Sequence, residues 1–421
     1  MADDRIIVGL DIGTSVIRVA IGEVDENDKL HIIATSAKKS AGMRNGVIVN
    51  IEDAKDAIRE SIEDAENKAG VLVNSVIASI GGSQIESQNS RGVVPIRNNG
   101  KGGSSAVTRE DVERVIEVAK AINYPADRET IHVIPQDYLV DGIGHIPDPI
   151  NRLGFKLESK VHIITASKTI IQNFKSCMSR AGYGLDGVML KTLAVTQAVA
   201  HEDELELGSI IIDFGAGTTD VMVLYEGAPV STASVQVGGN LVTNDIAVVY
   251  GIPVAVAEEI KINHGCCHPA VLKQNSEVVI QGAGGRPPSV TTREDVTAII
   301  NARMTQILTM VFQAIKKNTS DIITELAGNI ILTGGGAKME GIVNLVQDVF
   351  KTNAVRVGIP ENLGGIEEEY RKPEFATAIG LVVANKGIVS ARDRRRKSRK
   401  QPAQDGEEKE NILKRLRKLF F

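Results

Sequence analysis

Short apolar runs that end in glycine-containing turns set the pattern of this chain. Residues 6–10 are apolar and lead into the turn Asp-Ile-Gly-Thr-Ser at 11–15, after which residues 16–21 and 31–34 are again largely apolar. Apolar runs of this length between turn residues are typical of buried β-strands. The start of the chain therefore predicts a β-hairpin with a glycine loop and a third strand behind it.

The same pattern returns in the second half of the chain. Ser-Ile-Ile-Ile at 209–212 leads into Asp-Phe-Gly-Ala-Gly-Thr-Thr-Asp at 213–220, and residues 221–224 are apolar again. An apolar strand that ends in Asp-x-Gly-x-x and is followed by another apolar strand thus occurs twice, which indicates an internal duplication. We predict an α/β protein with two lobes, each of which opens with the same hairpin.

The segment between the two hairpins divides into a core strand and an insertion. Residues 71–81 have the pattern of a strand with its exit turn. Residues 83–160 differ in amino-acid pattern and contain a polar, glycine-rich stretch at 98–105. A helix is predicted to begin at Thr108, because Asp111 three residues later can serve as its capping partner. We interpret residues 83–160 as an inserted subdomain.

Four further elements follow the second hairpin. Residues 258–264 are predicted to be helical, and the polar, proline-containing residues 273–292 to form a loop within a second insertion. Residues 301–316 have the pattern of a long amphipathic helix. The apolar residues 330–333 form a strand that runs into the triple glycine at 334–336.

The C-terminal segment has two parts with different composition. Residues 392–410 are highly charged and nearly free of apolar side chains, so they are predicted to stay unfolded. The last eleven residues place isoleucine, leucine and phenylalanine on one face of a helix and four cations on the other. This pattern favours a helix at the boundary between lipid headgroups and acyl chains. The residues predicted to bind the membrane are Ile412, Leu413, Lys414, Arg415, Leu416, Arg417, Lys418, Leu419, Phe420 and Phe421.

The C-terminal segment also differs from the rest of the chain in its charge. Residues 392–421 contain 12 basic and 5 acidic residues, a local charge of +7, so the rest of the chain carries −12 of the total of −5. An acidic body with a basic tail indicates two separate tasks. The alternatives for the tail are a C-terminal helix docked on the body and a basic run that binds nucleic acid. The chain has no Trp and only 3% aromatic residues, which argues against stacked bases or sugars as ligands.

Chain length and the number of cysteines limit the classes of protein to which this chain can belong. A chain of 421 residues with 43% hydrophobic residues is long enough for at least two packed cores. The three cysteines, Cys177, Cys266 and Cys267, offer no disulfide framework and favour a reducing cytoplasm. We expect no signal peptide and no spanning helix, since no uninterrupted apolar run reaches ~18–20 residues. Zinc at residues 264–268 is disfavoured, because the spacing is too tight for a tetrahedral site.

The two hairpin loops have a direct use in binding phosphate. Glycine allows the backbone to approach a phosphate closely and to point successive N–H groups at its oxygens. Asp11 and Asp213 would repel a bare polyphosphate, but they suit the water shell of a Mg²⁺ ion that neutralises it. Two such loops facing one another would hold a triphosphate between the lobes. The chain has no P-loop motif.

The loop motifs carry a family resemblance. Residues 11–15, residues 213–220 and Thr-Gly-Gly-Gly-Ala at 333–337 resemble the phosphate-1, phosphate-2 and adenosine motifs of the actin, Hsp70 and sugar-kinase superfamily. Within it, nearly the whole chain resembles the FtsA family of bacterial cell-division proteins. The motifs that carry this closer resemblance lie at residues 238–247, 257–261 with 264–266, 285–288, and 132–136 with 140–142 and 148–149.

This resemblance implies a fold: α/β, actin-like (a duplicated ribonuclease H-like ATPase fold) with two lobes, an FtsA-type inserted subdomain and a C-terminal amphipathic helix. The implied parts are the first lobe at residues 1–82 and 161–207, an SHS2-like inserted subdomain at 83–160, the second lobe at 208–243 and 305–385, its own insertion at 244–304, a disordered linker at 386–410 and the amphipathic helix at 411–421.

The resemblance also implies ATP and Mg²⁺ as cofactors, with Asp11 and Asp213 binding the metal through water. Glu258 and Lys261 would flank the adenosine, opposite the triple glycine. The residues expected to bind the nucleotide are Asp11, Gly13, Thr14, Ser15, Asp213, Gly215, Gly217, Thr218, Thr219, Gly238, Gly239, Glu258, Lys261, Gly334, Gly335 and Gly336.

The implied role is a peripheral protein on the cytoplasmic side of the inner membrane at the division septum. It would self-associate into polymers, link the tubulin-like protein FtsZ to anionic lipids, and help recruit later division proteins. The FtsZ tail would dock on the second-lobe insertion. No nucleic acid is expected.

Two positions depart from the family pattern. Lys191 stands where Glu or Gln is usual, and this position orients the attacking water in relatives that hydrolyse ATP. A protonated lysine cannot accept a hydrogen bond from that water, although it can neutralise charge. We therefore expect ATP binding with weak or absent hydrolysis. The second departure, Asn151-Arg152 in place of Gly-Met, affects only a loop shape.

Three rival functions are alternatives to this role. A small-molecule kinase of the same superfamily would need an acceptor site with a carboxylate base, and no dedicated set is visible. A pilus-assembly protein with this fold would bind a partner's peptide and lack the basic tail. A chaperone-like ATPase would need a peptide-binding domain after the second lobe.

Overall fold

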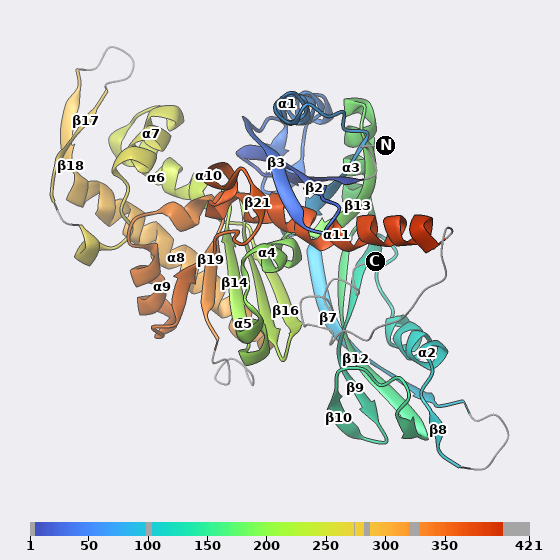
Figure 1. Cartoon of the computed structure of the whole chain (residues 1–421). Helices are drawn as coiled ribbons and strands as arrows, with labels where there is room; N and C mark the ends of the chain where they lie inside the picture. Colours follow the sequence, from blue (N-terminus) through green and yellow to red (C-terminus); the bar gives the residue numbers. More distant parts are fainter. Residues whose placement is uncertain (1–4, 98–102, 273, 282–286, 320–327, 399–421) are drawn as a thin grey trace.

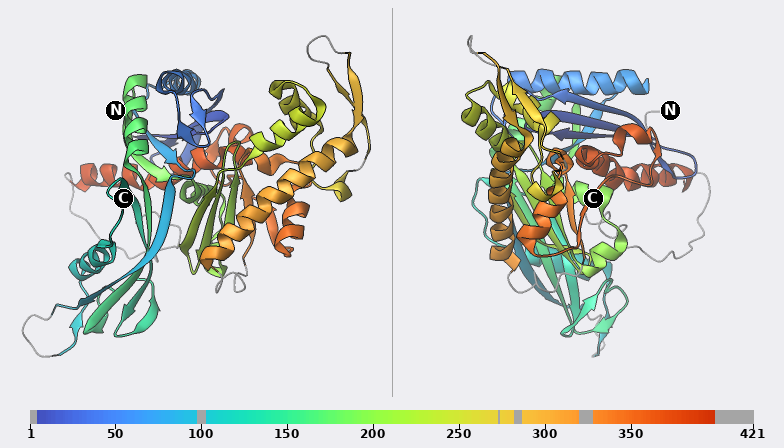
Figure 2. Two further views of the ribbon diagram at one scale, coloured as in Figure 1. Left: turned by 180° about the vertical axis from the view of Figure 1, so that it is seen from behind. Right: turned by 90° about the vertical axis from the view of Figure 1, so that its left-hand side faces the viewer.

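The protein has two lobes, each built on its own β-sheet, and a smaller subdomain that projects from the first lobe (Figures 1 and 2). The computed structural model describes residues 5–97, 103–272, 274–281, 287–319 and 328–398. The six-stranded sheet of the first lobe and the five-stranded sheet of the second lobe lie on either side of helices that they share.

The sheet of the first lobe begins with the predicted hairpin. Its strands, in spatial order, are β13 (Gly184–Leu190), β6 (Ser75–Ile80), β1 (Ile6–Ile12), β2 (Val16–Val24), β3 (Leu30–Lys39) and β21 (Gly364–Gly365). Strands β1, β2 and β3 run antiparallel to one another, whereas β6 and β13 continue in parallel from β1. Helices α1 (Ile51–Ala69) and α3 (Lys168–Ala181) cover one face.

The sheet of the second lobe repeats this topology. Its order is β16 (Ala228–Val235), β15 (Thr219–Tyr225), β14 (Ser209–Phe214), β19 (Ile330–Thr333) and β20 (Val355–Val357). The first three strands are again an antiparallel meander, and β19 and β20 again run parallel to the opening strand. Five strands thus match in order and direction between the lobes, and the predicted duplication is confirmed.

Two helices fill the space between the sheets. Helix α4 (Lys191–Val199) and helix α11 (Ala376–Ser398) contribute Leu193 and Leu381 to one continuous apolar core. The first sheet adds Ile32 to this core and the second adds Ile211 and Ile331, all fully buried. Because one core joins both lobes, the two hairpin loops are held at fixed positions relative to one another.

Helices of the second half of the chain build the second-lobe core: α8 (Arg293–Thr319) and α9 (Ile342–Phe350) pack on the second sheet, and α6 (Gly239–Tyr250) and α7 (Val254–His264) pack against each other and against α8. The elements that complete the description are β4 (Met43–Arg44), β5 (Val47–Ile48), α5 (Glu202–Leu207), α10 (Glu367–Tyr370) and the 3₁₀ turns Pro269–Val271, Gly335–Lys338 and Pro373–Phe375.

Helix α8 is, among the described residues, the single helix long and apolar enough to span a membrane, by length and composition. The bent pair of α6 and α7 passes the same test only when it is counted as one span. One face of α8 lies in the second-lobe core, with Ile300 and Leu308 fully buried. Arg303 on this helix pairs with Asp245 of α6 at 2.5 Å. Packing accounts for the composition of α8.

The projecting subdomain is an antiparallel sheet with one helix. Its strands, in order, are β10 (Ile143–Ile146), β9 (Arg128–Val140), β12 (Lys156–Ser167) and β7 (Ile85–Pro95), with α2 (Arg109–Lys120) packed on them and the short pair β8 (Ser105–Ala106) and β11 (Leu153–Gly154) beside them. Thr108 and Asp111 form the predicted capping box at the start of α2. The helix start predicted from the sequence is confirmed.

Two predictions about the second half of the chain are wrong. Residues 273–292 do not form a plain loop, because β17 (Glu277–Ile280) and β18 (Ser289–Thr292) pair as an antiparallel hairpin. Val278 and Ile280 are buried while Glu277 and Val279 are exposed, so a two-residue period was present but was masked by the polar flanks.

The linker prediction also needs correction. Helix α11 continues to Ser398 and so includes residues 386–398, which were expected to be unfolded. A helix anchored in the core can extend cheaply, because adding a residue to an existing helix avoids the nucleation step and Arg and Lys are good helix formers. The rest of the predicted linker and the membrane-binding residues 411–421 lie outside the described residues.

Candidate functional site

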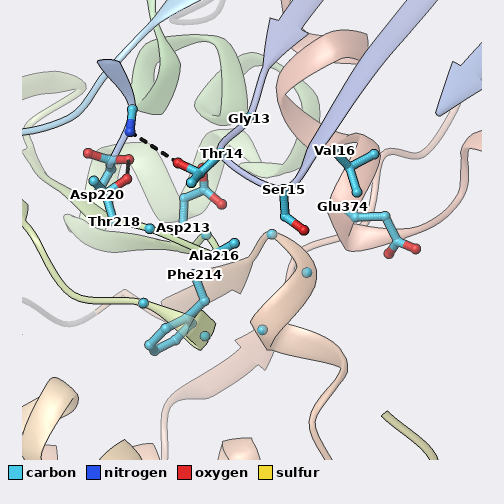
Figure 3. A pocket seen from close by; sticks show the side chains of 18 of the residues that line it. Gly13, Thr14, Ser15, Val16, Asp213, Phe214, Ala216, Thr218, Asp220 and Glu374 are labelled. Carbon is cyan, nitrogen blue, oxygen red and sulfur yellow. Dashed lines mark hydrogen bonds between the residues drawn. The ribbon is translucent and has the colours of Figure 1, made fainter. Parts of the chain in front are cut away.

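A cavity of about 550 Å³ lies between the lobes, and both hairpin loops line it (Figure 3). Every residue predicted to bind nucleotide lines this cavity except Thr219. The hydroxyl of Thr219 is buried and donates to the carbonyl oxygen of Val237 at 2.8 Å. Asp11 and Asp213, more than two hundred residues apart in the chain, therefore share one cavity wall.

The first loop connects β1 to β2 and presents Gly13, Thr14 and Ser15 to the cavity. The hydroxyl of Thr14 accepts a hydrogen bond from the Gly46 N–H at 3.0 Å. Asp11, at the end of β1, is 4% exposed and accepts a hydrogen bond from the Ser79 hydroxyl at 2.7 Å. Neighbouring segments of the first lobe thus fix this loop in position.

The second loop lies directly against the first. A Cβ atom placed on Gly217 would lie 2.7 Å from Thr14 Oγ1 and 2.9 Å from Asn45 Cα, closer than real Cβ contacts. At this position only glycine lets the two loops meet. The start of α6 packs on the same loop, since a Cβ on Gly238 would lie 2.6 Å from the Gly215 carbonyl oxygen.

The triple glycine also lines the cavity. Gly334 has a φ of 79°, in the left-handed region that favours glycine. A Cβ atom there would overlap Asp213 Oδ1, so the turn after β19 lies directly on this carboxylate. The predicted adenosine turn and the second loop are therefore in contact.

A carboxylate that was not among the predicted site residues joins the lobes. Asp220 Oδ1 accepts a hydrogen bond from the Gly82 N–H of the first lobe at 3.2 Å, and its Oδ2 accepts one from the Thr218 hydroxyl at 3.0 Å. Figure 3 shows Asp220 beside Thr218. The available signal was the acidic residue that closes the second motif, Thr-Thr-Asp at 218–220.

Lys191, the first residue of α4, is the cation at the centre of this group. Its Nζ lies 2.7 Å from Asp213 Oδ2. Burial by itself lowers the pKa of Lys191, but the carboxylates of Asp213, Asp11 and Asp220 outweigh burial and hold the pKa above its ordinary value. Lys191 is therefore a protonated ammonium ion inside a cluster of three buried carboxylates.

The other end of the cavity is defined by α7. Glu258 and Lys261 are one helical turn apart, and their side chains pair at 2.7 Å. Lys261 also donates to the Thr243 hydroxyl at 2.9 Å and to the Gly239 carbonyl oxygen at 3.3 Å. These bonds fix the lysine against α6, on the side of the cavity that belongs to the second lobe.

A histidine of the inserted subdomain supports the site from behind. The Leu190 N–H donates to His132 Nε2 at 3.0 Å, directly before Lys191. Burial lowers the pKa of His132 to about 4, so its imidazole is neutral and can accept this bond. Nothing in the sequence indicated the contact, because a lone histidine in a strand gives no sign of its partner.

The geometry defines a class of protein. Two lobes of the same topology each bring a glycine loop to one cavity, where the two loops meet beside buried carboxylates, and the triple-glycine turn lines the same cavity. Glycine loops suit the close approach of phosphate oxygens, and a cavity of this size suits a nucleotide-sized ligand. The fold and site are those of the actin-like class.

Comparisons with known proteins specify the family. A family model described as cell division protein FtsA matches residues 210–380, and one described as the SHS2 domain inserted in FtsA matches residues 82–165. Cell division protein FtsA of Borreliella burgdorferi is 45% identical over 90% of each chain. That of Pseudomonas aeruginosa is 35% identical over 90% of this chain and 89% of the relative. The chain belongs to the FtsA family of cell division proteins.

Solved structures agree on the fold. The PilM–PilN type IV pilus biogenesis complex matches with a TM-score of 0.63 at 18% identity, covering 90% of this chain and 97% of that one. MreB5 of Spiroplasma citri bound to ADP matches with a TM-score of 0.53 at 15% identity, covering 92% and 98%. At these identities the likeness concerns the fold alone, and it gives the pilus and kinase alternatives no support over cell division.

Proposed function

We propose that the protein binds ATP with Mg²⁺ in the cavity between its lobes. The observation that carries this proposal is the contact of two duplicated glycine loops across one cavity. Backbone N–H groups and hydroxyls of both loops would bind the phosphates. Glu258 and Lys261 would flank the adenosine on one side and Gly334, Gly335 and Gly336 on the other.

Two carboxylates on the cavity wall suit a hydrated Mg²⁺ ion. Asp11 and Asp213 are buried carboxylates on the cavity wall, and a carboxylate is the group that accepts hydrogen bonds from water on Mg²⁺. Asp213 is already paired with Lys191. When bound, the ion would neutralise phosphate charge, and Asp11 would hold its water shell.

Hydrolysis of ATP is expected to be slow. A protonated ammonium has only donors, so Lys191 cannot orient an attacking water through an accepted hydrogen bond. The proposed role is therefore that of a nucleotide-controlled structural protein. Its conformation and self-association would respond to ATP without rapid turnover.

We further propose that the protein tethers the division machinery to the membrane. Membership in a family of cell division proteins supports a place at the septum, with FtsZ and later division proteins as partners and polymers of this chain as the assembled form. The basic amphipathic residues 411–421 would bind anionic lipids on the cytoplasmic side of the inner membrane. Avidity in a polymer would multiply the weak binding of each tail.

Calorimetry with ATP and Mg²⁺ tests the nucleotide site. The wild-type protein should bind, and Gly217→Val should lower the affinity by about 5- to 150-fold, because overpacking costs ~1–3 kcal/mol and each 1.4 kcal/mol is tenfold. Gly187→Ala is the matched control, since a Cβ there meets nothing within 4 Å. Wild-type protein that takes up no ATP would refute the proposal.

Sedimentation with liposomes tests the tether. The full chain should pellet with vesicles containing phosphatidylglycerol and should remain in the supernatant with neutral vesicles. A version that ends at Gln401 should remain in the supernatant with both. Equal behaviour of the two versions would exclude a tether in the last twenty residues.

A further inference from the structure

The cavity carries an excess of buried negative charge. Asp11, Asp213 and Asp220 are 4%, 1% and 4% exposed, and all three line the same space. Buried carboxylates are strongly unfavourable unless a cation accompanies them. A site of this kind needs a positive charge before an anionic phosphate can enter.

Lys191 supplies that charge from within the fold. Its Nζ is 2.7 Å from Asp213 Oδ2 and lies beside the second loop, since a Cβ placed on Gly215 would be 3.8 Å from it. The stem of the side chain passes the exit turn of the first lobe, where a Cβ on Gly81 would be 3.4 Å from Lys191 Cβ. The ammonium therefore lies at the point where segments of both lobes converge.

The ammonium has bonding capacity left over. A lysine has three N–H donors, and among the described residues the ion pair with Asp213 is the one salt bridge that Lys191 makes. The side chain is 15% exposed and lines the cavity rather than a closed core. Donors therefore remain for a ligand oxygen on the cavity side.

We propose that Lys191 is a built-in cation of the nucleotide site, which binds the phosphates of ATP itself and makes ATP binding only weakly dependent on a divalent metal ion. This inference rests on the proposed binding of ATP. Where Mg²⁺ alone offsets the charge of carboxylates and phosphates, removal of the metal leaves like charges face to face. Here one positive charge stays in place when the metal is removed.

The test compares the dissociation constant for ATP in Mg²⁺ with that in EDTA, measured by calorimetry. For the wild type, the constant should rise by less than about tenfold in EDTA. For Lys191→Gln it should rise by ~10–100-fold more than for the wild type, since a hydrogen bond to a charged group contributes ~1.5–3 kcal/mol. Lys191→Arg should retain most of the wild-type behaviour, because the charge is kept.

Lys261→Gln is the matched control. It removes a cation from the same cavity but from the α7 end, where Lys261 is bonded to Glu258 and Thr243. This variant should weaken binding by the same factor in both buffers. A metal-dependent difference confined to position 191 would then identify the phosphate end.

The outcomes separate the two proposals. If the dissociation constant for ATP rises by the same factor in EDTA for the wild type and for Lys191→Gln, the role of Lys191 is overturned and ATP binding is left intact. If the wild type binds no ATP in Mg²⁺ and none in EDTA, both proposals are overturned. If thermal melting shows that Lys191→Gln is unfolded, the wild-type protein alone decides the test. A dissociation constant for ATP that rises by more than about a hundredfold from Mg²⁺ to EDTA, some 2.7 kcal/mol, overturns the inference.

Discussion

At the scale of single residues, two buried histidines join the inserted subdomain to the lobes. His132 accepts the hydrogen bond from the Leu190 N–H. The Nδ1 atom of His162 is hydrogen-bonded to Asn89 Oδ1 at 2.6 Å. Its Nε2 atom is hydrogen-bonded to the hydroxyl of Thr232 in β16 at 3.0 Å. Burial lowers the pKa of each imidazole to about 4, so both rings are neutral in the folded protein.

These histidines predict how stability depends on pH. In the unfolded chain each titrates near 6.5, so between pH 6.5 and about 4 the unfolded state binds more protons than the folded state. Their contribution is complete above pH 6.5 and is lost as pH falls through this window, by up to ~1.4 kcal/mol per pH unit for each histidine. Urea unfolding at several values between pH 7 and pH 5 measures the slope.

The double variant His132→Gln/His162→Gln should have a flatter slope over this range. Glu204 and Asp64 do not interfere, because salt bridges and hydrogen bonds lower the pKa of each to about 2 despite partial burial, and both groups stay charged above pH 5. Burial raises the pKa of Asp213, but this group is present in both proteins and cancels in the comparison. A slope as steep as that of the wild type would show that other groups govern the pH dependence.

At the scale of elements, helices α11 and α4 pack closely on one another. Gly380 of α11 has no room for a side chain, since a Cβ atom there would overlap the Ala194 carbonyl oxygen of α4. This contact lies in the core that joins the two sheets. Glycine at this position therefore sets the distance between the lobes.

Substitution of Gly380 should destabilise the whole protein. Gly380→Val should lower the free energy of unfolding by at least ~1–3 kcal/mol, the range for overpacked cores. Gly387→Ala on the same helix is the control: a Cβ there meets nothing within 4 Å, and replacing a helical glycine by alanine should gain up to ~1 kcal/mol. Chemical denaturation of both variants gives the comparison, and equal stability would contradict the close packing.

The elements also show where sequence patterns succeed. Both hairpins and the start of α2 were predicted, because alternation, glycine turns and capping residues are encoded within a few neighbouring positions. The β17–β18 hairpin and the continuation of α11 to Ser398 were missed. In the first case polar flanks hid a short alternating pattern, and in the second a packed helix extended into residues with no apolar face.

At the scale of the whole molecule, the two lobes should act as a clamp on the nucleotide. The loops at residues 13–15 and 215–218 come from different sheets yet line the same cavity, and Asp220 of one lobe binds Gly82 of the other. A ligand held by both loops would stabilise the lobes together. Ligand binding at one hundred times its dissociation constant raises the free energy of unfolding by ~2.7 kcal/mol.

Hydrogen exchange with and without ATP tests the clamp. Saturating ATP should slow exchange in both loops, since both sets of N–H groups would bind phosphate oxygens. Peptides from the inserted subdomain around α2, which contribute no residue to the cavity, serve as the internal control. Protection confined to one lobe would mean that the nucleotide is bound by a single loop.

The sequence by itself determined the duplicated hairpins and the glycine loops that line the cavity, since strand periodicity and loop chemistry are local properties of the chain. Only the tertiary structure decided which charges meet. The pairing of Lys191 with Asp213 and the contact of Gly217 with Thr14 depend on how two sheets pack on one shared core. Such contacts join residues far apart in sequence, and no local pattern specifies the distance between them.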